Sequence, residues 1–355
     1  MIRFRSKVSY DGTSFLGWQT QRSVQKRTVQ GTLEEAIGLV FNVTLPYTDH
    51  ESNSTISIPA AVVVGAGRTD TGVHALEQHV HFSVPSSRLV AATMLNNVSA
   101  VASSINAVLP PDIVLYDLSF APTSRWHSIL TSKSKIYTYR FVLGPGTVLD
   151  PLLRRTRSHV YYDVSLPLLK KVLALFKGEH DFEAFACGVE ANLRKRTLNY
   201  VPSSSSSPPA LAAFPPPPPP FPPPSFVRVV HSIKLAKEGP SSYRIDVHLS
   251  GALYKMVRNI VGFAFGVCRR RTSSSRDQDG MRTPIPPEDN DSESEDEARR
   301  FLEVRSLLRR LMNEEEEGDD RRRQEQGGKR TRNDNPYKPV PPNGLRLERV
   351  FYRTD

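Results

Sequence analysis

The sequence has little cysteine and no long hydrophobic run, and each absence removes a class of protein. Only Cys187 and Cys268 occur among the 355 residues, far apart and outside any metal-binding motif. A disulfide framework and a thiolate metal site are therefore not supported, and a reducing compartment fits best. No apolar stretch reaches the roughly 18 residues of a membrane helix, so we expect a protein of the cytoplasm or nucleus without a membrane segment.

The first ten residues predict a strand and leave no space for a targeting segment. Ile2, Phe4, Val8 and Tyr10 alternate with basic residues and serine. This alternation is typical of a half-buried strand that begins almost at once. We therefore expect neither a signal peptide nor a transit peptide.

Positive charge lies outside one segment of the chain. The formal net charge is +10 with an isoelectric point near 9.6. Residues 269–335 hold 16 basic and 18 acidic side chains, so the remainder carries a net charge of +12. A basic folded part favours a polyanionic partner such as nucleic acid.

Two segments depart from the pattern of a globular domain. Residues 201–225 contain 12 of the 29 prolines, and residues 269–335 combine charges of both signs with few aromatic side chains. We expect both to be largely disordered insertions, on which a protein partner could dock. Within the second, residues 298–312 have apolar side chains at helical spacing, which predicts a short docked helix.

The other segments alternate between strand and helix patterns, which predicts an α/β (α+β) fold. The patterns divide the chain into two α/β halves of similar plan, residues 1–117 and 118–355. Expected helices cover 28–41, a stretch from about 88, 165–178 and 252–268, and expected strands cover 2–10, 61–67, 77–84, 113–116, 135–143, 242–250 and 345–352.

The stretch "GAGRTDTGVHA", residues 65–75, places the lone carboxylate Asp70 among small residues. A dinucleotide fingerprint would need glycine where Asp70 stands, and a Walker loop would need Lys and Ser or Thr where Val73 and His74 stand. Asp70-Thr71-Gly72 is the triplet of aspartic proteases, but the chain has no second copy, so such an enzyme would have to dimerise. An ordinary turn residue is the simplest alternative.

Two other patterns bear on the role of Asp70. The expected helix 252–268 is apolar on nearly every side yet carries Arg258, whose charge needs a carboxylate partner if it is buried. Tyr137, Tyr139 and Phe141 alternate onto one face of the expected strand 135–143, which begins at Lys135. They predict either an ordinary sheet core or an aromatic platform for unstacked bases.

Eight motifs, in order along nearly the whole chain outside the two insertions, together resemble the TruA-type tRNA pseudouridine synthase family. They are "VSYDGTSFLGWQTQ" (8–21), "TVQGTLEEAI" (28–37), "GAGRTDTGVHALEQHVHF" (65–82), "NAVLPPDIVL" (106–115), "KIYTYRF" (135–141), "KGEHDFEAF" (177–185), "MVRNIVG" (256–262) and "PPNGLRLERVFY" (341–352). The resemblance implies the pseudouridine synthase fold, with two ferredoxin-like halves that form one antiparallel sheet and a central basic cleft. It also implies a homodimer that isomerises uridine to pseudouridine in the anticodon stem-loop of tRNA, at positions 38–40 or nearby, without a metal or cofactor.

The resemblance also gives roles to four residues of this sequence. Asp70 matches the catalytic aspartate, and Arg258 the arginine that pairs with it. Tyr137 matches the tyrosine that stacks on the target base, and Arg68 the arginine that enters the space left by the flipped nucleotide. Ile129 stands where the family often has an arginine that touches RNA.

Two alternatives to the enzyme remain open. An RNA-binding protein of the same fold that has lost its activity is the first, and a dimeric aspartic protease is a distant second. His74, His79 and His81 lack acidic or cysteine partners nearby in the sequence, so we expect solvated or RNA-facing histidines and no metal site.

Overall fold

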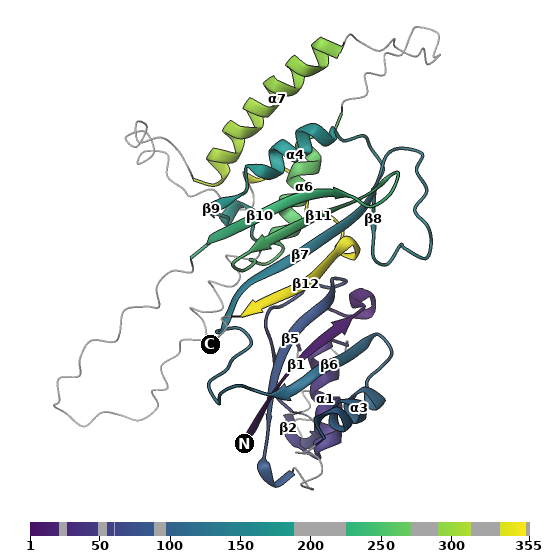
Figure 1. The fold of residues 1–355 in the computed structure, drawn as a ribbon, viewed down its shortest axis with the longest axis vertical. Helices are drawn as coiled ribbons and strands as arrows, with labels where there is room; N and C mark the ends of the chain where they lie inside the picture. The colour runs from purple at the N-terminus through teal and green to yellow at the C-terminus, as the bar shows by residue number, and fades with distance from the viewer. Residues whose placement is uncertain are drawn as a thin grey trace, which may run out of the picture.

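The computed structural model describes residues 1–20, 27–48, 55–59, 61–88, 97–187, 225–270, 290–313 and 334–352. These residues form one large sheet with helices packed along it (Figure 1). The proline-rich insertion, apart from residue 225, and most of the charged insertion lie outside the described residues. None of the described helices is long and apolar enough to cross a membrane.

The sheet runs in the order β6-β1-β5-β12-β7-β11-β10-β9, with β4 paired to β5 and β8 paired to β7. Its strands are β1 (Ile2–Tyr10), β4 (Val63–Gly65), β5 (His74–Val84), β6 (Ile113–Phe120), β7 (Ser132–Leu143), β8 (Ser158–Val160), β9 (Gly178–Asp181), β10 (Val227–Lys237), β11 (Ser242–Leu249) and β12 (Leu345–Tyr352). A separate hairpin joins β2 (Thr44–Thr48) to β3 (Thr55–Pro59). The mixed α/β architecture with a large, mostly antiparallel sheet agrees with the predicted pseudouridine synthase fold.

The sheet is antiparallel, as predicted, except at two pairings. Strand β12 runs parallel to β5 where the two halves of the sheet meet, and β8 runs parallel to β7. Apart from β8, each half builds its own antiparallel ladder, so strand direction across the β5–β12 junction depends on how the halves dock and not on a hairpin. We call β1, β4, β5 and β6 with their helices the N-terminal half, and β7–β12 with theirs the C-terminal half.

The helices expected at 28–41 and 252–268 begin and end close to where the sequence predicts them, whereas the helix expected from about residue 88 is described only from residue 98. In the N-terminal half, α1 spans Val29–Phe41, and the Thr28 side chain caps it by accepting the N–H of Gly31. The helix expected from about residue 88 is α3 (Val98–Val108), preceded by a short 3-10 turn at Ser86–Arg88. In the C-terminal half, α4 spans Leu166–Ala174 and α6 spans Met256–Val267.

Helix α6 is buried on nearly every side, as its apolar sequence predicts. The segment before β12 packs along this helix so closely that a Cβ on Gly262 would lie 2.1 Å from the carbonyl oxygen of Lys338. The Val340 N–H also donates to the carbonyl of Arg258 at 3.1 Å. This segment therefore fixes α6 against the sheet.

The docked helix predicted at 298–312 is present as α7, which starts earlier and spans Asn290–Leu311. It packs against α4 and buries Val304, Leu308 and Leu311. Part of the second insertion thus belongs to the folded core.

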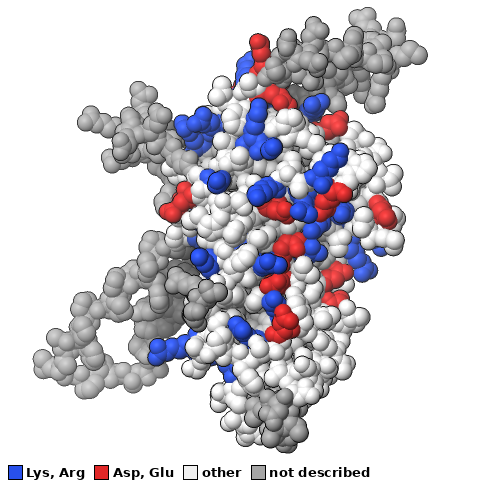
Figure 2. Space-filling view, viewed as in Figure 1, with Lys and Arg blue, Asp and Glu red and all other residues white. Residues whose placement is uncertain are grey.

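One row of side chains shows that both halves turn their cores to the same face of the sheet. Cross-strand partners follow each other from Tyr10 through Ala75, Leu347 and Tyr137 to Val247, and all five are buried. Side chains alternate between the two faces of a strand, so the intervening residues lie on the opposite, open face. Figure 2 shows acidic and basic side chains interleaved across the middle of the molecule.

The structure decides between a sheet core and an aromatic platform for two of the three aromatic residues on β7. Tyr139 and Phe141 are fully buried, with ring centroids 6.3 and 4.8 Å from that of Phe265 on α6. They are core residues, and the aromatic platform is wrong for both. Only Tyr137 lies next to the Asp70 loop.

Candidate active site

Asp70 lies in the loop between β4 and β5, and buried side chains hold this loop through hydrogen bonds. The Tyr10 hydroxyl lies 2.8 Å from the Thr69 hydroxyl. Gln78, which is fully buried, donates from Nε2 to the carbonyl of Gly67 at 2.6 Å. The positions just before Asp70 are therefore fixed by side chains from β1 and β5.

A second loop, from the "SFLGWQ" stretch, supports the other side of the Asp70 loop. The Trp18 N–H donates to the carbonyl of Thr69 at 3.0 Å. Gly17 has φ of +87°, and a Cβ there would lie 2.6 Å from that same carbonyl oxygen. Only glycine allows this left-handed backbone and this close approach together.

The carboxylate of Asp70 pairs with Arg258 from the other half of the molecule. Arg258 Nη1 lies 3.0 Å from Asp70 Oδ2, and the two side chains are only 10% and 13% exposed. Arg258 Nε donates to the carbonyl of Val340 at 2.8 Å, so the guanidinium is held at two points. The carboxylate that the buried Arg258 was expected to need is Asp70.

Tyr137 reaches the same place from β7 and is 6% exposed. Burial, and then the nearby Asp70 carboxylate, raise the pKa of its hydroxyl. The group is therefore neutral at physiological pH and can donate a hydrogen bond. The structure thus brings Asp70, Arg258 and Tyr137 together.

Arg68 differs from these three because it is exposed. In the part of the chain that the structure describes, it has no ion pair or hydrogen bond, although Thr69 and Asp70 beside it are anchored. Its side chain is thus available to a substrate.

Lys135 also lies at this site, although it is not among the four residues predicted for it. It is two positions before Tyr137 on the same face of β7 and is 8% exposed. Burial, and then the charge of Arg228, lower the pKa of its ammonium group. The sequence shows a lysine beside the aromatic strand, but burial of its charge becomes visible only in the fold.

Of the three histidines that the sequence predicted to be solvated or RNA-facing, His74 and His81 are buried instead, while His79 is partly exposed. His74 is 3% exposed, accepts the Gly12 N–H at Nδ1 and donates from Nε2 to the Arg155 carbonyl. His81 is 4% exposed, with Nδ1 2.9 Å from the Ser128 hydroxyl. Both point into contacts between segments, because the strand that carries them is covered on both faces at these positions. Across the described ranges, no group of three metal-binding side chains occurs.

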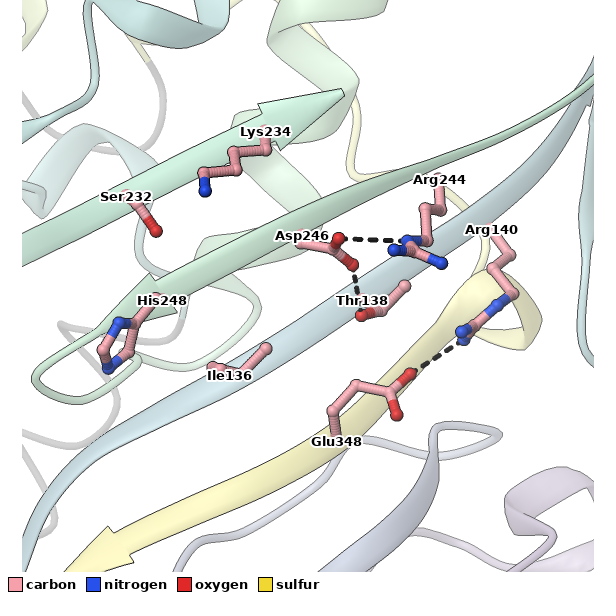
Figure 3. A pocket seen from close by; sticks show the side chains of 9 residues that line it. All are labelled: Ile136, Thr138, Arg140, Ser232, Lys234, Arg244, Asp246, His248 and Glu348. Atoms are coloured by element: carbon pink, nitrogen blue, oxygen red, sulfur yellow. Dashed lines mark hydrogen bonds and ion pairs between the residues drawn. The ribbon is translucent and has the colours of Figure 1, made fainter. Parts of the chain in front are cut away.

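A cavity of about 410 Å³ lies on the opposite face of the sheet and is separate from this site (Figure 3). Thr138 and Arg140 line it, and they alternate along β7 with the residues that face Asp70. Four of its charged side chains pair within the wall: Arg140 with Glu348 at 2.8 Å, and Arg244 with Asp246 at 3.0 Å. Lys234 also lines the cavity, and the described residues form no ion pair with it.

Comparison with known proteins shows which family the chain resembles. No protein-family model matches the chain. The tRNA pseudouridine synthase A of Anoxybacillus flavithermus is 30% identical over 270 residues, which cover 76% of this chain and 85% of that protein. That of Solidesulfovibrio magneticus is 30% identical over 277 residues, 77% of this chain and 80% of the relative.

A third relative matches a shorter stretch. The tRNA pseudouridine synthase A of Latilactobacillus sakei is 37% identical over 184 residues, and the chain spans 63% of its length. The two longer matches take in most of both proteins. The chain therefore belongs to the tRNA pseudouridine synthase A family.

Proposed function

We propose that the protein is an isomerase that converts uridine to pseudouridine in tRNA, with Asp70 as its catalytic carboxylate. The observation that carries the proposal is the Asp70–Arg258 pair, held in a nearly solvent-free position beside Tyr137 in a chain of this family. A carboxylate held in place by a buried arginine suits a nucleophile or base.

The reaction breaks the bond between ribose C1′ and N1 of uracil, turns the base and joins C1′ to C5. The proton lost from C5 is balanced by one gained at N1, so the isomerisation needs no co-reactant. Asp70 either attacks C1′ or removes a ribose proton, and Arg258 keeps the carboxylate oriented for both. Tyr137, whose hydroxyl stays neutral, offers a ring face for the detached uracil.

A uridine inside a stem must leave the stack before its C1′ can reach Asp70, which costs a few kcal/mol. Arg68 is the exposed cation nearest in sequence to Asp70, and we assign it to the space that the flipped nucleotide leaves. We further propose a uridine of the anticodon stem-loop as the target, a homodimer as the assembly and the cytoplasm or nucleus as the location. A protein partner bound through either insertion also belongs to this proposal.

The alternatives make different predictions for the same residue. A dimeric aspartic protease needs a second carboxylate that shares a proton with the first, whereas Asp70 has an arginine as its charged neighbour. An inactive RNA-binding protein would bind tRNA whether or not Asp70 is present.

The test is to incubate the protein with tRNA transcripts and to map pseudouridine at each position. Asp70→Asn keeps the size and polarity of the side chain and should reduce conversion by at least about a thousandfold while tRNA binding persists. Asp117→Asn is a matched control, because Asp117 is 62% exposed on the open face and pairs with Lys7. Conversion by Asp70→Asn at the native rate would refute the catalytic role, and binding without conversion by the native protein would favour the inactive alternative.

A further inference from the structure

Lys135 is a buried cation for which the structure describes no anion. Its side chain is directed into the Asp70 site, since its Nζ would lie 3.4 Å from a Cβ placed on Gly67 of the catalytic loop. Within the described ranges, no carboxylate and no hydrogen-bond acceptor contacts this ammonium group. A buried and unpaired charge destabilises a protein unless a ligand supplies the opposite charge.

A second cation lies beside it. Lys135 is opposite Leu249 on β11, and Leu249 is opposite Val230 on β10. Arg228 is two residues before Val230 and so shares this face at the end of β10. Its Nη1 donates to the carbonyls of Ser225 and Val227, which leaves its other N–H groups available to a ligand.

The two charges oppose each other. The charge of Arg228 adds to burial in lowering the pKa of Lys135, and burial also lowers the pKa of Arg228. Buried charges in a protein core are normally paired with an opposite charge. Here two partly desolvated cations lie together, and no carboxylate is described beside them. Departures of this kind occur mainly at functional sites.

We propose that Lys135 and Arg228 form a phosphate subsite that holds the backbone of the target nucleotide while its ribose meets Asp70. This inference rests on the proposed function and names two substrate-binding residues for it. The phosphate is joined to the same ribose whose C1′ must approach Asp70, so it enters the site with that sugar. The missing side chain at Gly67 leaves a gap between Lys135 Nζ and the Tyr137 hydroxyl, which a Cβ would meet at 3.4 and 3.9 Å.

The subsite also explains why the RNA-free protein keeps two cations that repel each other. When the phosphate arrives, the mutual repulsion of the two cations is relieved, and this gain offsets part of the cost of extracting the nucleotide from its stack. Lys135 therefore destabilises the free protein and stabilises the complex.

The experiment combines a substitution in the protein with the removal of a single phosphate charge from the RNA. A tRNA anticodon stem-loop is prepared with a neutral methylphosphonate at one position at a time, on the 5′ and 3′ sides of each uridine. Equilibrium binding is measured for the native protein and for Lys135→Met. We expect Lys135→Met to weaken binding of the unmodified RNA about tenfold and to reduce the slope of log K against log salt by about one.

On the RNA in which the contacted phosphate is neutral, Lys135→Met should change binding less than twofold. Arg228→Gln should lose its effect on binding at the same methylphosphonate position. Lys234→Met is the matched control, because Lys234 lines the cavity on the open face. A tenfold effect of Lys135→Met that persists at every methylphosphonate position would overturn the subsite, as would no effect on any RNA.

A second readout separates binding from a structural role. Replacing an unpaired buried charge with an apolar side chain should raise the thermal midpoint of the RNA-free protein, whereas loss of a structural contact would lower it. A lower midpoint for Lys135→Met would also count against the subsite. If the native protein binds RNA with this coupling and makes no pseudouridine, the proposed function fails and the subsite stands.

Discussion

Replacing Arg258 with methionine tests whether the pair with Asp70 is truly desolvated. The variant leaves the Asp70 carboxylate, 13% exposed, without its cation, and leaves the Val340 carbonyl without a donor. Breaking a buried pair by removing one partner costs about 3–5 kcal/mol, and the residual exposure of Asp70 favours the lower end. The lost hydrogen bond to Val340 adds about 1 kcal/mol.

We therefore expect Arg258→Met to lower the free energy of unfolding by about 4 kcal/mol. For a folded core of this size, that corresponds to a fall of roughly 10 °C in the thermal midpoint. The assay is urea unfolding at neutral pH, followed through the fluorescence of Trp18 and Trp126. Adding Asp70→Asn to the variant removes the unpaired charge and should restore about 2 kcal/mol, because the two sites are coupled.

The control for this experiment is an ion pair of similar length on the open face. Arg244 Nε lies 3.0 Å from Asp246, but the arginine is 41% exposed, so Arg244→Met should cost less than about 1 kcal/mol. If Arg258→Met costs no more than Arg244→Met, or if Asp70→Asn makes it worse, the carboxylate is solvated and the reasoning about a buried pair is refuted.

Three further outcomes follow from the packing. Burial, and then the neighbouring His127 and Arg3, lower the pKa of His81 to about 4, so the unfolded chain binds the proton more readily. Stability should therefore fall by about 2 kcal/mol as the pH drops from 6.5 towards 4, measured by urea midpoints, and His81→Asn should flatten this dependence. Gly17→Ala forces a side chain against a backbone carbonyl and should reduce pseudouridine formation at least tenfold in the same mapping assay, with tRNA binding retained. Leu308→Ala should cost about 3 kcal/mol of unfolding free energy, and Leu302→Ala on the exposed side of the same helix less than about 0.5; equal costs would show that α7 does not dock as described.

Local sequence patterns were sufficient to predict a helix or strand where one of its faces is buried. Helix α1 has a side-chain cap at Thr28 and one apolar face, so its N-terminus and its period were both readable. Helix α6 was recognisable as a buried helix, and the need of Arg258 for a carboxylate followed from that burial. These predictions hold because the information lies within one segment.

Elements that take their stability from neighbours were not predicted. Strand β10 buries only Val230, so its sequence has no clean alternation, and it forms because β11 and β9 pair with both of its edges. Strand β9 has four residues, which is too few for a pattern. The buried charge of Lys135 was also invisible, because a lysine at a strand end is normally solvated.

The site depends on the docking of two halves that share little of the sheet ladder. Only two residue pairs, His74 with Arg346 and Ala75 with Leu347, register across the β5–β12 junction. The Asp70–Arg258 pair crosses the same junction and joins residues that are 188 positions apart in the chain. An ion pair that fixes the proposed catalytic carboxylate therefore also fixes one half against the other. Because each function needs the same geometry, a change that loosens the junction should reduce catalysis before it unfolds either half.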